Sequence, residues 1–225
     1  MIPFYKIVSN YLLIKDYLLT KKDLLNNYIF KKDLFNYYIF WSCVTNFFIS
    51  IESVLGTHSM LSVVSKAKTE TIISMNYIGK DILGQIGGMM IIYNIGQYLD
   101  KNPKDYIVKN MFIEQTSIFI ECLIPFLPRI LFIPIATVAN IGKTVTFTGF
   151  GGINAKVIQK YAINDNIGEL YSKICIINTI ASSLGMCVGL ILISIIKCPY
   201  YRILLIPMLG FLRYKSYNRS ITDIL

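Results

Sequence analysis

The stretch ICIINTIASSLGMCVGLILISII, residues 174–196, contains no Asp, Glu, Lys or Arg and lies between Lys173 and Lys197. As an α-helix its 23 residues would be about 34 Å long, at ~1.5 Å per residue. The hydrocarbon core of a bilayer is about 30 Å thick, so such a helix is long enough to cross it. The stretch therefore predicts a transmembrane helix, and with it a helical membrane protein.

The composition of the whole chain favours the same class. Of its 225 residues, 54% are hydrophobic and 16% are charged, and the mean hydropathy is +0.54. An average soluble domain has about 25% charged residues, so this chain has little charge to cover a water-soluble surface. Intrinsic disorder is excluded for the bulk of the chain by its hydrophobicity. The apolar runs are also too long and uniform for barrel strands of about ten alternating residues.

Further helices are expected on both sides of this stretch. The other apolar stretches are residues 34–51, 82–99, 111–127, 130–155 and 203–212. The first two have 18 residues each, which is near the lower limit for a span. The third and fourth are expected to form two helices that fold back on each other at Pro125, Pro128 and Arg129. The sequence thus predicts an all-α polytopic membrane protein with about five or six membrane-embedded helices.

Three parts of the chain are distinguished by their composition. Residues 1–33 form a basic N-terminal arm with a ten-residue duplication, in which KKDLLNNYIF (21–30) is followed by KKDLFNYYIF (31–40). Two copies are too few for a repeat architecture. Residues 34–221 form the expected membrane domain, and 222–225 are a short tail.

The basic residues predict the orientation of the helices. Positive residues near the ends of spans favour the cytosolic side, so the lysine-rich arm is expected there. The basic residues near the C-terminus are Arg213, Lys215 and Arg219. A turn at Cys198-Pro199 and a short return through residues 200–212 would bring them to the cytosol as well. A hairpin with both termini cytosolic is therefore expected.

The net charge of +9 allows two interpretations, nucleic-acid binding and the positive-inside bias of a membrane protein. The basic residues stand in short runs between apolar stretches, which favours the second. The expected partner is the lipid bilayer, and no nucleic acid is expected. The five cysteines form no C-x-x-C pair and His58 is the single histidine, so no metal site is indicated. No nucleophile–base pair or phosphate loop is present, so the chain is expected not to be an enzyme, and no cofactor is identified.

Five polar residues inside or beside apolar stretches form the candidate intramembrane site: Lys80, Asp81, Glu121, Asn140 and Lys143. An ionisable group in a membrane helix is costly unless it is paired, hydrated or near the interface. For Lys80 and Asp81, a place in the wall of a polar cavity and a place at the level of the lipid headgroups are equal alternatives. For Glu121 we expect a cation from another helix, either Lys80 or Lys143.

Small residues four positions apart suggest where helices pack closely. Gly84 and Gly88 form one G-x-x-x-G motif, and Gly185 and Gly189 form another, which Ala181 extends by one step. Such strips allow two helices to approach closely in lipid. They serve either an oligomer or partner interface or packing inside the chain. The second is favoured, because most strips of this kind in polytopic proteins make contacts within one chain.

These residues belong to a longer spaced pattern. It comprises Lys80-Asp81-x-x-Gly84-x-x-Gly87, Gly96, Leu99-Asp100-x-Asn102-x-Lys104, Glu121-x-x-x-Pro125-x-x-Pro128 and Asn140-x-x-Lys143. Further positions are Gly151, Ala155, Ala162, Asn166, Lys173, Thr179 and Gly185. In this order and spacing the chain resembles the root UV-B sensitive family of eukaryotic membrane proteins, over roughly residues 36–221. A long spaced set is far more specific than any single short motif.

The resemblance implies an integral protein of an intracellular endomembrane that is linked to UV-B responses of roots and to vitamin B6 status. It supplies no catalytic residue. The positions that depart from the family pattern are Met111, Asn154, Lys160, the pair Gly168-Glu169 and the pair Ile177-Asn178. If those positions form the family's site, the site is altered here. The leading hypothesis is a protein that handles a small molecule at the polar site. The alternative is a membrane scaffold that binds protein partners through its Gly strips and basic loops.

Overall fold

The computed structural model describes the backbone of residues 4–65, 70–162 and 165–222, and the side chains of residues 33–65, 72–162 and 165–220. Within these ranges every regular element is helical, which confirms the all-α fold class. The elements are α1 (Phe4–Val64), α2 (Glu70–Lys101), α3 (Pro103–Leu123), the 3-10 turns η1 (Ile124–Phe126) and η2 (Arg129–Leu131), α4 (Phe132–Tyr161), α5 (Ile167–Ile195) and α6 (Pro199–Thr222).

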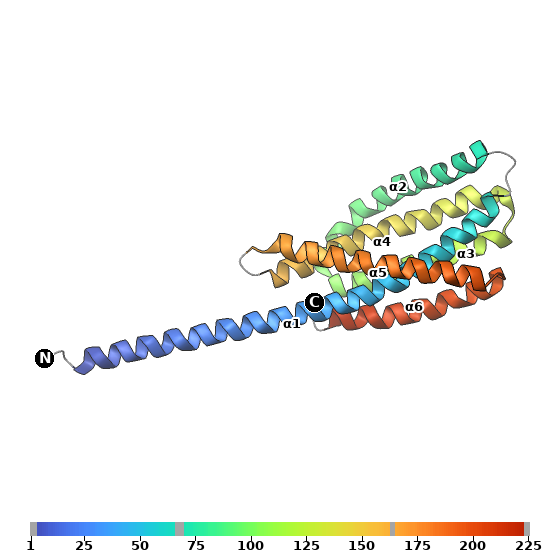
Figure 1. Ribbon diagram of the computed structural model, residues 1–225. Helices are drawn as coiled ribbons and strands as arrows, with labels where there is room; N and C mark the ends of the chain where they lie inside the picture. Colours follow the sequence, from blue (N-terminus) through green and yellow to red (C-terminus); the bar gives the residue numbers. More distant parts are fainter. Residues whose placement is uncertain (1–3, 66–69, 163–164, 223–225) are drawn as a thin grey trace.

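The helices form a bundle in which α1 and α4 are central (Figure 1). Helix α4 packs between α2 and α3, and α1 packs against α5, α6 and α3. Helix α6 also contacts α3, so α1, α3 and α6 enclose a common interior. The N-terminal part of α1 extends well beyond the other helices. The helix is continuous through residue 33, and the division into arm and membrane domain stays a prediction. The side chains of the arm up to residue 32 lie outside the described ranges.

Two predicted chain reversals are present in the structure. Between α3 and α4 the chain turns through η1 and η2, with Pro125 in the first and Pro128 directly before the second. Proline has no backbone N–H and fixes its φ angle, so it ends α3 at this point. Helix α4 then continues through Lys143 without a break. Between α5 and α6 the chain reverses at residues 196–198, and Pro199 begins α6, where a missing N–H costs nothing.

The expected length of the last helix is wrong. The return was expected to end near residue 212, with Arg213 outside it, but α6 continues to Thr222 and buries Arg213 to 1% exposure. The physical reason is a stripe of inward-facing residues with helical spacing that continues past Arg213. It comprises Leu209, Arg213, Ser216, Tyr217 and Ser220, all buried. The side of the membrane that these residues face stays a prediction.

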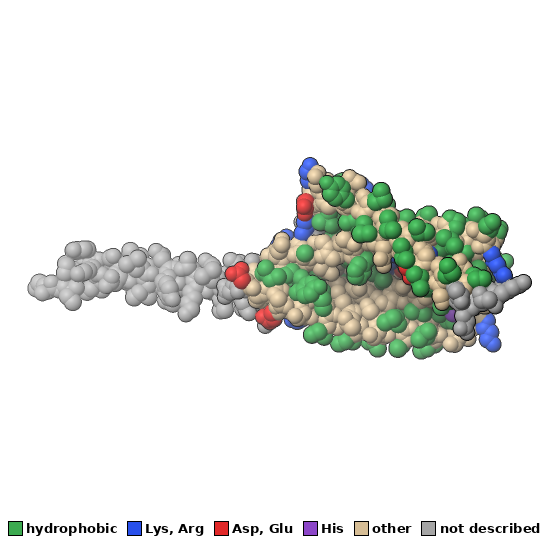
Figure 2. Space-filling model, turned by 90° about the horizontal axis from the view of Figure 1, so that it is seen from above, with side chains coloured by type: hydrophobic (Ala, Val, Ile, Leu, Met, Phe, Trp, Pro, Cys, Tyr) green, Lys and Arg blue, Asp and Glu red, His purple; other side chains and the backbone are tan. Residues whose placement is uncertain are grey.

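Three helical segments among the described residues are long and apolar enough to cross a membrane: Asp33–Val64, Arg129–Tyr161 and Ile167–Ile195. The number of five or six membrane-embedded helices stays a prediction. Many large apolar side chains point outward, and Figure 2 shows them distributed over the visible face of the bundle. On α5 they include Ile176, Ile180, Leu184, Leu190, Ile191 and Ile195.

Candidate functional site

The candidate site begins with two adjacent residues of α2. Lys80 is 4% exposed, and its Nζ lies 2.5 Å from Asp81 Oδ1 and 4.3 Å from the centre of the Tyr77 ring. Asp81 keeps 44% of its side chain exposed. The buried ammonium group is therefore held by a carboxylate and by the face of an aromatic ring, both of which stabilise a cation. The pair spans the boundary between the interior and the outside of the bundle.

Asn140 of α4 completes this part of the site. Its Nδ2 donates to Asp81 Oδ1 at 3.0 Å and to the backbone oxygen of Lys80 at 3.4 Å. The two helices approach closely here because α2 has Gly84 one turn after Lys80. A Cβ atom at Gly84 would lie 2.6 Å from the Asn140 side chain, far too close for real atoms. The glycine thus allows the amide to reach the carboxylate.

Glu121 of α3 pairs with Lys143 of α4. Glu121 is 1% exposed, and Lys143 Nζ donates to its Oε2. Of the two lysines considered from the sequence, the structure pairs Lys143 with this carboxylate. On its other side the Glu121 carboxylate lies directly against Gly56 of α1, where any larger residue would collide with it. A charged group at this depth is acceptable only with such a partner.

The five candidate residues thus come from three helices and meet in one region, which we call the polar site (Lys80, Asp81, Glu121, Asn140 and Lys143). Asn140 and Lys143 are three residues apart and lie on the same face of α4. The site has two ammonium groups and two carboxylates, so its charges balance. For Lys80 and Asp81, the place in the wall of a cavity and the place at the level of the headgroups both stay predictions.

The small residues of both strips contact other helices of the same chain. Gly88 lies against Thr144 of α4, since a Cβ atom at Gly88 would be 2.6 Å from Thr144 Cγ2. Gly185 lies against the backbone oxygen of Phe47 on α1. Gly189, one turn later on α5, lies against Val54, which is two turns after Phe47 on α1. Ala181 is buried. The α2 strip therefore faces α4, and the α5 strip faces α1.

A second buried charged group was missed in the sequence. We call it the arginine cluster (Glu52, Glu114, Gln115 and Arg213). Glu52 and Arg213 are 0% and 1% exposed. Arg213 Nη1 lies 3.2 Å from Glu52 Oε2 and donates to Glu114 Oε2 at 3.0 Å, and Nη2 donates to Gln115 Oε1 at 2.8 Å. The signal was available, since Glu52 stands alone within a long apolar stretch.

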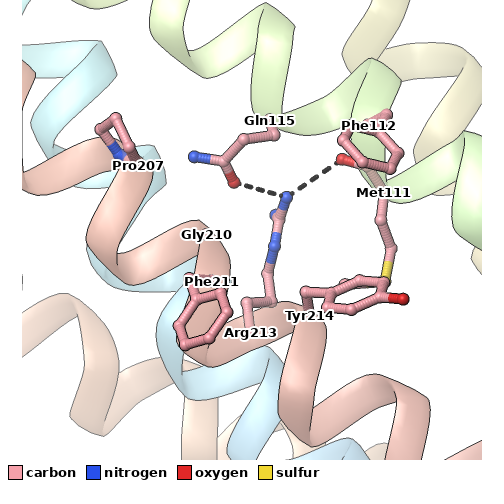
Figure 3. Close-up of a pocket in the computed structure, with 8 residues that line it drawn as sticks. All are labelled: Met111, Phe112, Gln115, Pro207, Gly210, Phe211, Arg213 and Tyr214. Atoms are coloured by element: carbon pink, nitrogen blue, oxygen red, sulfur yellow. Dashed lines mark hydrogen bonds between the residues drawn. The ribbon is translucent and has the colours of Figure 1, made fainter.

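A cavity of about 310 Å³ between α3 and α6 reaches this cluster. Its lining residues are Met111, Phe112, Gln115, Pro207, Gly210, Phe211, Arg213 and Tyr214 (Figure 3). In Figure 3 the Arg213 side chain extends from α6 toward α3, where it meets Gln115 and the backbone oxygen of Met111. The wall is mostly apolar, and its polar side chains are Gln115 and Arg213 of the cluster and the Tyr214 phenol.

Comparison with known proteins now identifies the family. Residues 30–220 match the family model described as "Vitamin B6 photo-protection and homoeostasis domain". The chain belongs to the root UV-B sensitive family. Two of its relatives are "Protein root UVB sensitive 3" of Arabidopsis thaliana, 25% identical over 142 residues, and "RUS family member 1" of Dictyostelium discoideum, 24% identical over 151 residues.

These matches are partial for the relatives. They cover 62% and 66% of this chain but only 32% and 29% of those two proteins, so the root UV-B sensitive domain described here spans about a third of their length. No solved structure matches the chain. The family assignment therefore rests on sequence, and the present geometry adds the side-chain arrangement.

In this root UV-B sensitive chain, five further pattern positions lie outside the polar site: Asp100, Asn102, Lys104, Asn166 and Lys173. The first four are at helix ends, and Lys173 is about two turns inside α5. Asp100 Oδ1 lies 3.1 Å from Lys156 Nζ, which links the end of α2 to α4. Asn102 and Asn166 directly precede α3 and α5. Lys173 donates to Asn36 Oδ1 of α1 at 3.1 Å.

Four of the departures from the root UV-B sensitive pattern lie in different places. Met111 is buried in the wall of the cavity, and Asn154 accepts a hydrogen bond from Tyr38. Lys160 is exposed, and Ile177 packs against the apolar core formed by α1, α4 and α5. None of them is a member of the polar site, so these substitutions leave its five side chains in place.

Proposed function

We propose that this root UV-B sensitive chain is a polytopic, non-enzymatic protein of an intracellular membrane that binds a small molecule of the vitamin B6 group at the polar site. Membrane insertion is supported by three helices of sufficient length and apolarity and by the outward-facing isoleucines and leucines of α5. An apolar outer surface of this extent would be unfavourable in water. The vitamin B6 group is chosen from the description of the family model.

The observation that carries the proposal is the convergence of the polar site from α2, α3 and α4 in an otherwise apolar bundle. Buried ionisable groups in membrane helices commonly mark substrate pathways. Compounds of the vitamin B6 group have a pyridine ring with a phenolic hydroxyl. A second ring substituent is an alcohol, aldehyde or amine, and a third is a hydroxymethyl group that is free or phosphorylated. Lysine ammonium groups suit the phenolate or phosphate, and carboxylates suit the ring N–H.

The partly exposed members of the site offer the first contacts. Asp81 and Lys143 keep 44% and 22% of their side chains exposed, whereas Lys80 and Glu121 are enclosed. A charged ligand that reaches Asp81 and Lys143 can form ion pairs with them in place of the existing pairs with Lys80 and Glu121. The energetic cost of opening a pair is thereby reduced, because a new partner replaces the lost one.

A membrane scaffold that binds protein partners is the alternative. The Gly strips contact helices of the same chain, which leaves the exposed basic residues as its main support. The two functions differ in what a substitution at the polar site should do. A scaffold needs the site only for folding, whereas a binding protein needs it for affinity at normal protein abundance.

The first test is membrane association. After expression in a eukaryotic host, the chain should stay in the membrane fraction through carbonate and high-salt washing and leave it with detergent. Release by carbonate alone would contradict membrane insertion.

The second test is ligand binding by the detergent-purified chain. Pyridoxal 5′-phosphate, pyridoxal and pyridoxine are titrated while protein fluorescence is measured. The variants Asp81→Asn and Glu121→Gln should weaken binding at least tenfold, that is by about 1.4 kcal/mol, while the protein remains folded. Asp100→Asn, at the exposed end of the same helix as Asp81, is the matched control and should bind as the unmodified chain does. Absence of binding for all three compounds would refute the ligand class.

A further inference from the structure

The arginine cluster contains more carboxyl groups than cations. Glu52 and Glu114 both face the guanidinium group of Arg213. The side chains of Glu52, Glu114 and Arg213 are 0%, 11% and 1% exposed. If both carboxyl groups were ionised, the interior would hold one uncompensated negative charge. Burying an unpaired charge is far more costly than protonating it. The cluster therefore needs one further positive charge.

The two carboxyl groups are not equivalent. Glu114 Oε2 accepts a hydrogen bond from Arg213 Nη1. Glu52 lies 3.2 Å from the same nitrogen, but within the described part of the chain neither of its oxygens has a hydrogen-bond partner. Glu52 is 0% exposed, while the Glu114 side chain is 11% exposed. Glu52 is thus the more enclosed and the less satisfied of the two.

The surrounding charges do not supply the missing compensation. The titratable and charged groups that face the two carboxyl groups are Cys122 on α3, Arg213 and Tyr217 on α6 and Lys143 on α4. Lys143 is engaged by Glu121. On α5, Lys173 reaches Asn36, which is 16 residues and therefore about 24 Å from Glu52 along α1.

We infer that the arginine cluster is a proton-binding site, in which Glu52 carries one proton and Glu114 stays ionised beside Arg213. The Glu52 carboxylate takes the proton from a hydronium ion, an O–H bond forms at one carboxylate oxygen, and a water molecule is released. A metal ion is a poorer occupant, because no group of three or more His, Cys, Asp or Glu residues in the described ranges is arranged to hold one.

The cavity between α3 and α6 gives this site a route for proton exchange. It is lined by Arg213 and Gln115, which belong to the cluster themselves. Its volume of about 310 Å³ exceeds the roughly 30 Å³ that a water molecule occupies in the liquid, so water fits beside these groups. Glu52 does not line the cavity itself, but Arg213, whose Nη1 lies 3.2 Å from Glu52 Oε2, does, so the cavity comes within one side chain of the carboxyl group. Proton binding here would let the chain respond to pH or couple its activity to protons.

The test is infrared difference spectroscopy of the detergent-purified full chain during a pH titration. A protonated buried carboxyl group gives a C=O stretching band that shifts in heavy water. We expect this band near neutral pH in the unmodified chain and its loss in Glu52→Gln. The variant Glu114→Gln is the matched comparison, since it removes a carboxyl group from the same cluster. Disappearance of the band in Glu114→Gln alone would overturn the assignment to Glu52.

Thermal unfolding gives a second, independent measurement. Glutamine has the shape and neutral charge of protonated glutamic acid, so Glu52→Gln should keep the unfolding midpoint at neutral pH within about 2 °C. Failure of Glu52→Gln to fold, or a midpoint lowered by several degrees, would show that the native carboxyl is ionised and would overturn the inference. A midpoint that rises with sodium concentration at fixed pH would also overturn it, in favour of a bound sodium ion. Neither readout uses vitamin B6 compounds, so the result is separate from that of the proposed binding function.

Discussion

The polar site and the arginine cluster are both buried groups of charges that include a glutamate of α3, but they differ in how their charges are compensated. The polar site has two lysines for two carboxylates, and each ammonium group lies beside its own acid. The arginine cluster has one guanidinium group for two carboxyl groups. The comparison shows that pairing suffices where the charges balance, whereas an unequal set needs a proton or another ligand.

The two groups also differ in their distance from the surface. Asp81 and Lys143 are partly exposed, so water can solvate whichever charge loses its partner. Glu52 and Arg213 are almost completely enclosed. Removal of a charge should therefore cost more stability in the arginine cluster than in the polar site, and the following changes test this order.

The largest effect is expected for Arg213→Met. The methionine fills part of the space but leaves Glu114 buried without its cation, and breaking a buried pair in this way costs about 3–5 kcal/mol. The unfolding midpoint of the detergent-purified chain should fall strongly. Lys215→Met, on the same helix but exposed and placed over the Phe211 ring at 4.7 Å, is the control and should change little. Equal effects of both substitutions would contradict the order proposed here.

In the polar site, Glu121→Gln and Lys143→Met should each cost about 1–3 kcal/mol, because each leaves one charge without its partner. The double variant should cost less than the sum of the two, since the balance of charge is restored. A double-mutant cycle from chemical or thermal unfolding measures this coupling. Strictly additive effects would mean that the pair contributes nothing as a pair.

An effect of similar size is expected when the contact between α2 and α4 is widened. Gly84→Ala places a Cβ about where Asn140 lies, and overpacking of this kind costs about 1–3 kcal/mol. Gly96→Ala is the matched change, because nothing lies within 4 Å of a Cβ there. On the same helix it should be neutral or slightly stabilising, as alanine is the better helix former. The two midpoints are compared directly, and a lower midpoint for Gly96→Ala would refute this explanation.

The smallest effect is expected for Asp105→Asn, at the exposed start of α3. Hydrogen bonds from Tyr98 and Lys109 lower the pKa of Asp105 below its ordinary value of 3.8. A lowered folded-state pKa stabilises the protein above the ordinary value, and this contribution is lost as the pH falls through the lowered value. Because the group is exposed, the change in midpoint at neutral pH should be close to experimental error. A large loss of stability would show that exposed pairs contribute as much as the two buried groups.

Much of the fold could be predicted from the sequence because lipid-compatible helices need long apolar stretches. The helix that contains residues 174–195 follows from this rule. The reversal at Pro125 and Pro128 and the turn before Pro199 follow from the absence of an N–H in proline. Lys143 and Glu121 were also found, since a lone charge inside an apolar stretch needs a partner. The choice of Lys143 over Lys80 could not be predicted, because it depends on how α3 and α4 are rotated.

The arginine cluster was not predicted, because its charged residues stand at the ends of charge-free runs in the sequence. Glu52 was treated as the limit of an apolar stretch, although α1 continues to Val64. Arg213 was treated as a residue beyond the last helix, although α6 buries it. A rule that looks for charge-free runs places every charged residue at a boundary. It therefore overlooks charges that lie inside a helix and face its neighbours.

Glu114 and Glu121 are seven residues apart on α3, two turns along the same face. Opposite them on α1 are Glu52 and Gly56, which are one turn apart. Apolar surfaces alone would let two such helices slide past each other with little preference. A shift of α3 by one residue relative to α1 and α6 moves a side chain about 1.5 Å along the axis and turns it by about 100°. It would separate Glu121 from the space at Gly56 of α1 and Glu114 from Arg213 of α6. Glu114 and Glu121 together thus fix the axial position and rotation of α3 relative to its neighbouring helices.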